Sequence, residues 1–148
     1  VERYATDLTI HFKNAEDKIK AYDVAFQGFD KSKKAIITLG EKATVLQEKL
    51  DILLKNDELS KSKIKEINQQ LIALEKSFLD KKGMYFGSWY RSLYAANDPF
   101  SGYASWILPG LEYEISQESS DRLDEWDERY STAILNLSSK MDILFNSL

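Results

Sequence analysis

An apolar residue recurs every three or four positions through the middle of this chain. The first run of this ladder consists of Ile36, Leu39, Ala43, Leu46, Leu50 and Leu53, and the second run consists of Ile64, Ile67, Leu71, Leu74 and Phe78. An apolar period of about 3.5 residues is typical of helices that pack along a shared seam. The ladder therefore predicts an all-α protein, an antiparallel helical bundle with coiled-coil seams and about four helices.

Similar stripes on either side of the ladder complete the expected domain. The stripe before it consists of Leu8, Phe12, Ala15, Ile19, Tyr22 and Phe26, and the stripe after it consists of Leu123, Trp126, Tyr130, Ile134, Leu137, Met141, Leu144 and Leu148. Gly28 suits the end of the first helix, and Asp30 or Ser32 suits the N-cap of the second. We expect a single helical domain over 1–148, with helices at roughly 2–27, 31–55, 60–94 and 111–147.

The polar interval 55–62 has two interpretations. Its Ser60 and Ser62 resemble capping residues of a short connection, which would fold the two runs of the ladder into an antiparallel hairpin. The alternative is an elongated rod with one continuous central helix over 31–94, roughly 96 Å long at about 1.5 Å per residue. We favour the hairpin because stacked helices bury each apolar stripe from several sides, at about 1.5–3 kcal/mol for each large side chain.

An aromatic insert at 84–113 interrupts the helical pattern before the last helix. Its candidate partner-binding residues are Tyr85, Phe86, Trp89, Tyr90, Arg91, Tyr94, Phe100, Tyr103 and Trp106. One interpretation is that the rings form a small core for a long connection. The other is a recognition surface, because Tyr, Trp and Arg dominate the energetics of protein interfaces.

The charge pattern bears on the possible partners. The net charge is −4, and acidic residues concentrate near the start of the last helix, as a solvated face or as a docking strip for a basic partner. The only arginines are Arg3, Arg91, Arg122 and Arg129. We expect no nucleic-acid binding, because its readers usually carry an arginine-rich basic stripe. Tyr and Trp also favour the membrane interface, but the insert lacks a belt of Lys and Arg beside it.

Groups that could catalyse a reaction or bind a metal are scarce. The chain has no cysteine, which excludes thiolate metal sites and disulfides. The single histidine, His11, has Asp7 one turn earlier but no evident nucleophile. Asp121, Asp124 or Glu125, and Glu128 share a helical face, yet no metal motif or phosphate-binding loop accompanies them. We therefore expect no enzyme, no cofactor and no metal site.

The sequence favours a non-enzymatic protein–protein interaction or assembly domain. We expect the insert to bind a protein partner or another copy of the chain. One alternative is a membrane-active or membrane-apposed helical protein, such as a toxin or pore component, and another is a structural spacer or scaffold. The absence of cysteine fits both an exported protein and a cysteine-poor cytosolic one, so it does not fix the compartment. Together with a start at Val1 rather than Met, it favours an exported or cell-surface protein, as a mature form or an excised fragment.

Overall fold

The computed structural model describes residues 2–148 and is mostly helical, as the apolar ladder predicts. The elements in chain order are α1 (Arg3–Lys20), α2 (Asp30–Lys55), α3 (Lys61–Leu74), a 3-10 turn η1 (Glu75–Phe78), β1 (Ala95–Asn97), β2 (Ser105–Ile107), α4 (Pro109–Ser116) and α5 (Leu123–Ser147).

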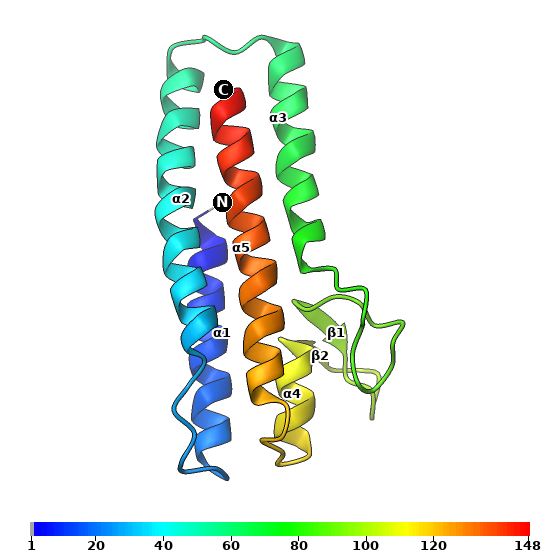
Figure 1. The fold of residues 1–148 in the computed structure, drawn as a ribbon. Coiled ribbons are helices and arrows are strands. Elements are labelled where there is room, and N and C mark those ends of the chain that lie inside the picture. The colour runs from blue at the N-terminus through cyan, green and yellow to red at the C-terminus, as the bar shows by residue number, and fades with distance from the viewer. Residues whose placement is uncertain (1) are drawn as a thin grey trace.

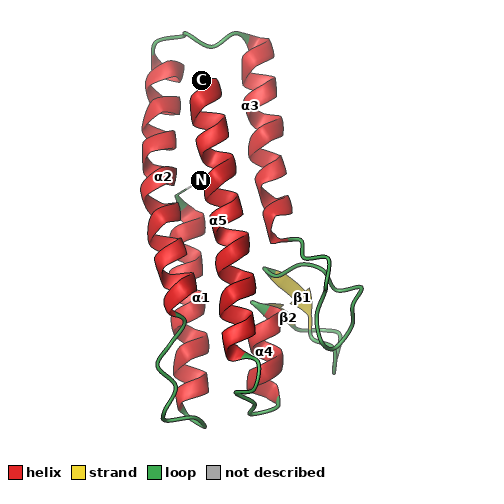
Figure 2. Ribbon diagram, in the orientation of Figure 1, coloured by secondary structure: helices red, strands yellow, loops and turns green. Residues whose placement is uncertain are grey.

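Helix α5 runs through the middle of the molecule (Figures 1 and 2). It packs along α2 on one side and against α3 and η1 on the other, while α1 packs on α2 and α4. The α2–α3 connection forms one end of the molecule, which we call the hairpin end. The loops, strands and α4 gather at the other end, which we call the insert end. Because α1 begins only midway along α2, it covers the insert end alone.

The polar interval in the ladder is a turn. Helix α2 ends at Lys55 and α3 starts at Lys61, with Asp57 in the left-handed region at φ 56°. Ser60 caps α3, because its hydroxyl accepts a hydrogen bond from the Lys63 backbone N–H at 3.2 Å. The alternative of one continuous helix over 31–94 is therefore wrong. Figure 1 shows α5 between α2 and α3, so both runs of the ladder face α5.

The expected bounds of the first, third and fourth helices are also wrong. The first helix ends at Lys20 instead of near residue 27, and residues 21–29 form a loop. The start of α2 lacks a cap from its own segment, and the Asp127 carboxylate of α5 supplies one. This carboxylate accepts hydrogen bonds from the backbone N–H groups of Lys31 at 3.0 Å and Ser32 at 2.8 Å. The cap thus comes from a residue that is distant in sequence.

The third and fourth expected helices are shorter than predicted. The third helix ends at Leu74, followed by η1, and the chain then turns through Gly83 at φ 69°. The expected last helix is divided into α4 and α5 by residues 117–122, where Glu118 has φ 47°. The apolar stripes therefore located the helices, while left-handed backbone and long-range contacts determine where they end.

The largest buried aromatic side chains of the core lie at the insert end. Trp126, Tyr130 and Phe12 are among its largest fully buried side chains. The Phe12 ring makes edge contacts with Tyr130 at 5.5 Å and with Phe29 at 5.6 Å between centroids. Each buried aromatic pair of this kind contributes about 0.5–1.5 kcal/mol beyond the burial of its area. The insert packs against this aromatic core.

Candidate functional site

The segment 79–113, which contains the aromatic residues of 84–113 and is called the insert from here on, leaves the helices after η1 and returns through α4. Strands β1 and β2 form an antiparallel hairpin in which Ala96 pairs with Trp106. The tip of this hairpin is held by Asp98, whose carboxylate accepts hydrogen bonds from the Phe100 backbone N–H at 2.8 Å and from the Ser101 hydroxyl at 2.7 Å. These hydrogen bonds lower the pKa of Asp98. The tip therefore has a defined conformation although it is exposed.

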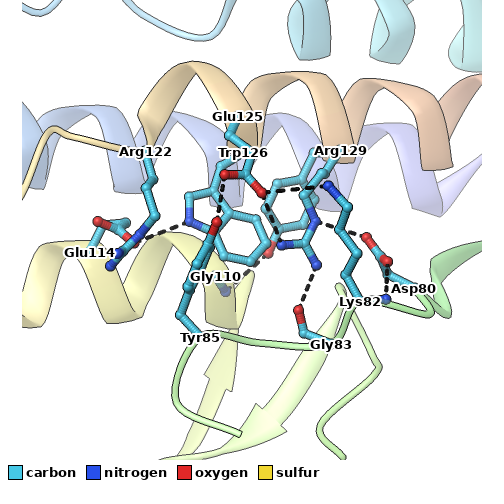
Figure 3. A network of polar contacts seen from close by, with 11 residues as sticks. Asp80, Lys82, Gly83, Tyr85, Gly110, Glu114, Arg122, Glu125, Trp126 and Arg129 are labelled. Atoms are coloured by element: carbon cyan, nitrogen blue, oxygen red, sulfur yellow. Dashed lines mark hydrogen bonds and ion pairs between the residues drawn. The ribbon is translucent and has the colours of Figure 1, made fainter. Parts of the chain in front are cut away.

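Arg129 of α5 attaches the first part of the insert to the helices (Figure 3). Its guanidinium donates to the Asp80 carboxylate at 2.8 Å and to the Gly83 carbonyl at 2.6 Å. Its side chain is only 8% exposed, and the guanidinium lies 4.1 Å from the centre of the Trp126 ring. A planar guanidinium that is fixed on both its edge and its face orients the backbone it binds.

A second contact joins Tyr85 to α5. The Tyr85 hydroxyl donates to the Glu125 carboxylate at 2.6 Å, and this bond raises the pKa of Tyr85. The Arg122 guanidinium lies 4.1 Å from the centre of the Tyr85 ring and donates to Glu114 at 2.7 Å. Glu114 is fully buried, and it also accepts a hydrogen bond from the Trp126 indole at 3.3 Å. Figure 3 shows these contacts beside those of Arg129, in one network along the start of α5.

Gly110 lets α4 approach this network closely. A Cβ at this position would lie 2.5 Å from the Trp126 ring, far below van der Waals contact. The Gly110 backbone N–H donates to the Tyr130 hydroxyl at 3.2 Å, and burial raises the pKa of Tyr130. The end of the insert therefore packs on Trp126, the ring that also contacts Tyr85 and Arg129.

The candidate partner-binding residues divide into exposed and partly buried groups. The exposed ones are Tyr85, Trp89, Arg91, Phe100 and Tyr103, and the partly buried ones are Phe86, Tyr90, Tyr94 and Trp106. Tyr94 packs on Phe78 with ring centres 5.4 Å apart, and burial raises its pKa. Tyr103 has the highest exposure, 97%, at the hairpin tip. The insert thus both packs a small core and presents rings to solvent.

Five of these rings form a continuous aromatic array. Its members, in order of contact, are Trp89, Tyr90, Phe86, Trp106 and Phe100. The ring centres of successive members are 5.7, 5.0, 5.9 and 6.0 Å apart. Both ends of the array are exposed, Trp89 by 75% and Phe100 by 66%. The structure therefore brings together rings from both parts of the insert.

Sequence reasoning missed the residues that anchor the insert. It assigned no buried contact to Arg122 or Arg129, and it interpreted the acidic residues near the start of the last helix as a solvated face or a docking strip. Instead, Glu114 and Asp127 are buried, and Glu125 binds Tyr85. A usable signal was present, since arginine is scarce in the chain but occurs at two positions one heptad apart.

Within residues 2–148, no group of three or more His, Asp or Glu side chains is arranged to hold a metal ion. The helices of this part of the chain are also not long and apolar enough to span a membrane. His11 is partly exposed near Trp106 and Glu112, along a shallow surface hollow.

The fold is that of a helical domain with an aromatic surface segment. Residues 10–142 match the family model of the transferrin receptor-like dimerisation domain, so the chain belongs to this family. This membership indicates a role in dimerisation or protein interaction. No curated protein matches the chain.

Proposed function

We propose that this chain is a non-enzymatic interaction domain that binds a protein partner through its aromatic insert. The observation that carries the proposal is the aromatic array, whose exposed ends, Trp89 and Phe100, belong to segments anchored by Arg129 and Asp98. Tyr103 extends the exposed aromatic surface at the hairpin tip. Exposed Trp and Tyr on an ordered backbone are the residue types that most often dominate binding energy.

Preorganisation is the physical reason that such a surface can bind well. Ordering a loop and its side chains on binding costs about 0.5–1.5 kcal/mol for each immobilised side chain. Here the ion pair between Arg129 and Asp80 and the turn at Asp98 order the backbone before any partner arrives. Binding then buries the exposed rings without the additional entropy cost of ordering this backbone.

Three carboxylates at the start of α5 are engaged within the fold, which favours an interaction role over a catalytic one for these three groups. Of the carboxylates on the first turns of α5, Glu125 binds Tyr85 and Glu128 pairs with Lys31 at 2.5 Å. Asp127 caps α2. Carboxylates engaged in this way stabilise the fold, and a general acid or base would need one that is free to exchange a proton with substrate.

The test compares partner capture by the wild-type chain and by a variant that lacks the exposed rings, Trp89→Ala/Phe100→Ala/Tyr103→Ala. Proteins captured by each tagged chain are quantified by mass spectrometry, and the partner with the greatest loss is purified for a direct affinity measurement. We expect its Kd to rise at least about tenfold, since losing one hot-spot ring costs about 2 kcal/mol.

The matched control replaces three exposed apolar residues elsewhere, in the variant Ile10→Ala/Val24→Ala/Ile72→Ala. It should bind the same partner as tightly as the wild type. Circular dichroism should show equal helix content in all three proteins. A partner that the control loses equally, or an aromatic variant that retains every partner, would contradict the proposal.

A further inference from the structure

A pocket with aromatic walls lies between the first turn of α1, the turn η1 and the first part of the insert. Its volume is about 530 Å³, and Tyr4, Phe78 and Tyr94 line it together with Glu75. None of the five rings of the aromatic array lines this pocket. A volume of roughly 300–1,000 Å³ is typical of sites for small molecules. The pocket is therefore a candidate ligand site that is separate from the proposed partner-binding surface.

The three rings of the pocket form one cluster. The centre of the Phe78 ring lies 6.4 Å from that of Tyr4 and 5.4 Å from that of Tyr94, with interplanar angles of 26° and 60°. Phe78 is only 3% exposed, whereas both tyrosines are partly exposed. Phe78 therefore forms the floor of the pocket, and the two tyrosine rings form its walls.

Two carboxylates lie beside these rings. Glu75 accepts a hydrogen bond from the Tyr4 hydroxyl at 3.4 Å, and burial together with this carboxylate raises the pKa of Tyr4. Asp7 lies near Tyr94, where it adds to the effect of burial in raising the pKa of Tyr94. Among residues 2–148, neither Glu75 nor Asp7 forms an ion pair. The negative charge of these two groups is therefore not neutralised by a direct contact.

Lys76 is the positively charged residue among those that line the pocket. It is exposed, and an ammonium on a flexible four-carbon stem can extend into water, so this side chain does not have to occupy the pocket. Its charge opposes a cationic ligand, while Glu75 and Asp7 oppose an anionic one. We expect the carboxylates to outweigh Lys76, because there are two of them and Glu75 is hydrogen-bonded to a ring of the pocket.

Aromatic faces beside a carboxylate attract organic cations. A cation within about 6 Å of the centre of an aromatic ring is attracted by the negative charge of the ring face, and cages of several rings recognise quaternary ammonium groups. A quaternary ammonium group carries no N–H, so it can be buried without hydrogen-bond acceptors. Its methyl groups can pack on the rings and on Leu79, which also lines the pocket and is 59% exposed.

We propose that this pocket binds an organic cation through its trimethylammonium group, which lies against the three rings with its positive charge towards Glu75. A trimethylammonium group occurs on free small molecules such as choline and on trimethylated lysine side chains, and both present the same chemistry to the pocket. This site does not rest on the partner-binding proposal, since Trp89, Phe100 and Tyr103 do not line the pocket.

Two ligands of the same shape test the requirement for charge. Choline and its neutral analogue 3,3-dimethylbutan-1-ol differ in the replacement of the ammonium nitrogen by carbon. Titrations of the wild-type chain, followed by NMR chemical shifts, should give a Kd of about 1 mM for choline, as expected for so small a ligand. The neutral analogue should bind at least about tenfold more weakly, because it lacks the attraction of a cation to the ring faces.

A third ligand identifies the source of the trimethylammonium group. The acetylated amide of Nε-trimethyllysine should bind more tightly than choline if the pocket recognises a modified lysine side chain, and more weakly if it recognises a free small molecule. The unmethylated lysine amide serves as its control and should bind more weakly than the trimethylated form.

Substitutions at three positions should shift the affinity for choline in different directions. Tyr94→Leu removes a ring and should raise the Kd about tenfold, while Tyr94→Phe keeps the ring and should leave the Kd within about twofold of the wild-type value. Glu75→Gln removes a negative charge at nearly constant size and should raise the Kd about threefold. Lys76→Ala removes the opposing charge and should lower the Kd about twofold.

The matched control is Trp89→Ala/Phe100→Ala/Tyr103→Ala, which removes three exposed rings outside the pocket. It should bind choline as tightly as the wild type, so the cation site and the partner-binding surface can fail separately. Circular dichroism checks that each variant remains folded. Glu75 and Lys76 are exposed, so their two variants still test the site if Tyr94→Leu unfolds.

Three outcomes would overturn the inference. The first is that neither trimethylammonium compound saturates the wild-type chain up to about 20 mM, a limit well above the expected Kd. The second is equal affinity for choline and for its neutral analogue. The third is a choline affinity that is unchanged in both Glu75→Gln and Lys76→Ala.

Discussion

The insert end and the hairpin end of this molecule are stabilised by different kinds of contact. At the insert end, buried Trp126 and Tyr130 carry a network of ion pairs and hydrogen bonds that reaches residues far away in sequence. At the hairpin end, aliphatic ladder residues such as Leu46 and Ile67 pack on α5 without such a network. Directional polar contacts fix the path of an irregular segment, whereas regular helices need only apolar burial to associate.

The largest loss of stability at the insert end should follow from replacing Trp126. Replacing it with alanine removes the ring on which Arg129, Tyr85 and Gly110 all rest. We expect Trp126→Ala to reduce the free energy of unfolding by about 4 kcal/mol, because truncating a fully buried Trp typically costs about 3–5 kcal/mol. Urea unfolding measures this value. A loss below about 1.5 kcal/mol would show that the insert end does not depend on this ring.

The ion pairs at the two ends should differ in strength. Arg129 is 8% exposed beside Asp80, so Arg129→Ala leaves one oxygen of the Asp80 carboxylate and the Gly83 carbonyl without their donor, while the Lys82 backbone N–H still binds the other oxygen of Asp80. We expect a loss of about 3 kcal/mol, because breaking a buried pair is costly. The matched change Lys42→Ala removes a partner of Asp142 from a pair that is more exposed, 34% and 48%, and should cost less than about 1 kcal/mol.

Thermal unfolding of both variants measures the difference, and limited proteolysis locates it. The first cuts in Arg129→Ala should fall within residues 79–94. Equal destabilisation by the two changes would mean that burial of the ion pair at the insert end contributes little.

Alanine substitutions at two glycines should change the free energy of unfolding in opposite directions. A methyl group at Gly110 would meet the Trp126 ring at 2.5 Å, so we expect Gly110→Ala to cost about 2 kcal/mol through overpacking. A methyl group at Gly40 in α2 would lie 3.5 Å from the Ala5 Cβ, an ordinary contact. Gly40→Ala should therefore stabilise the protein by about 0.5–1 kcal/mol through helix propensity. Chemical denaturation of both variants tests the signs, and a stabilising Gly110→Ala would refute the close approach of α4.

The contact between Tyr22 and Ser119 should make the stability of the protein depend on pH. Burial is the main cause that raises the pKa of Tyr22 to about 12, and its hydroxyl donates to the Ser119 carbonyl at 3.0 Å. Because the folded pKa exceeds the unfolded value of about 10, this stabilisation is complete below pH 10 and is lost as pH rises towards 12. Tyr22→Phe should cost about 1 kcal/mol at pH 8 and should flatten the fall in stability between pH 10 and 12.

Measuring the free energy of unfolding of wild type and Tyr22→Phe at several pH values separates this tyrosine from the others. The two curves should converge as pH rises. A constant gap between them up to pH 12 would show that the Tyr22 hydroxyl does not titrate with folding.

The apolar ladder was sufficient to predict the helical class and to favour a turn at residues 55–62. It could not predict that α5 lies between α2 and α3, since the same stripes also suit direct contact between the two runs. The aromatic insert was predicted as a surface or as a small core, and its rings divide between both roles. Arg122 and Arg129 escaped prediction because their partners are Glu114, Asp80 and a backbone carbonyl, none of which can be paired with them from local spacing.

Local periodicity therefore decided the helical class, because a residue's face on a helix depends only on its spacing from its neighbours. Tertiary contacts decided where the helices end and how the insert is held. Two hydrogen bonds show this. Asp127 of α5 caps α2, and Arg129 of α5 donates to the Gly83 carbonyl, so both contacts join segments far apart in the chain. Such contacts depend on the packed arrangement of α5 against its neighbours, which a one-dimensional pattern does not contain.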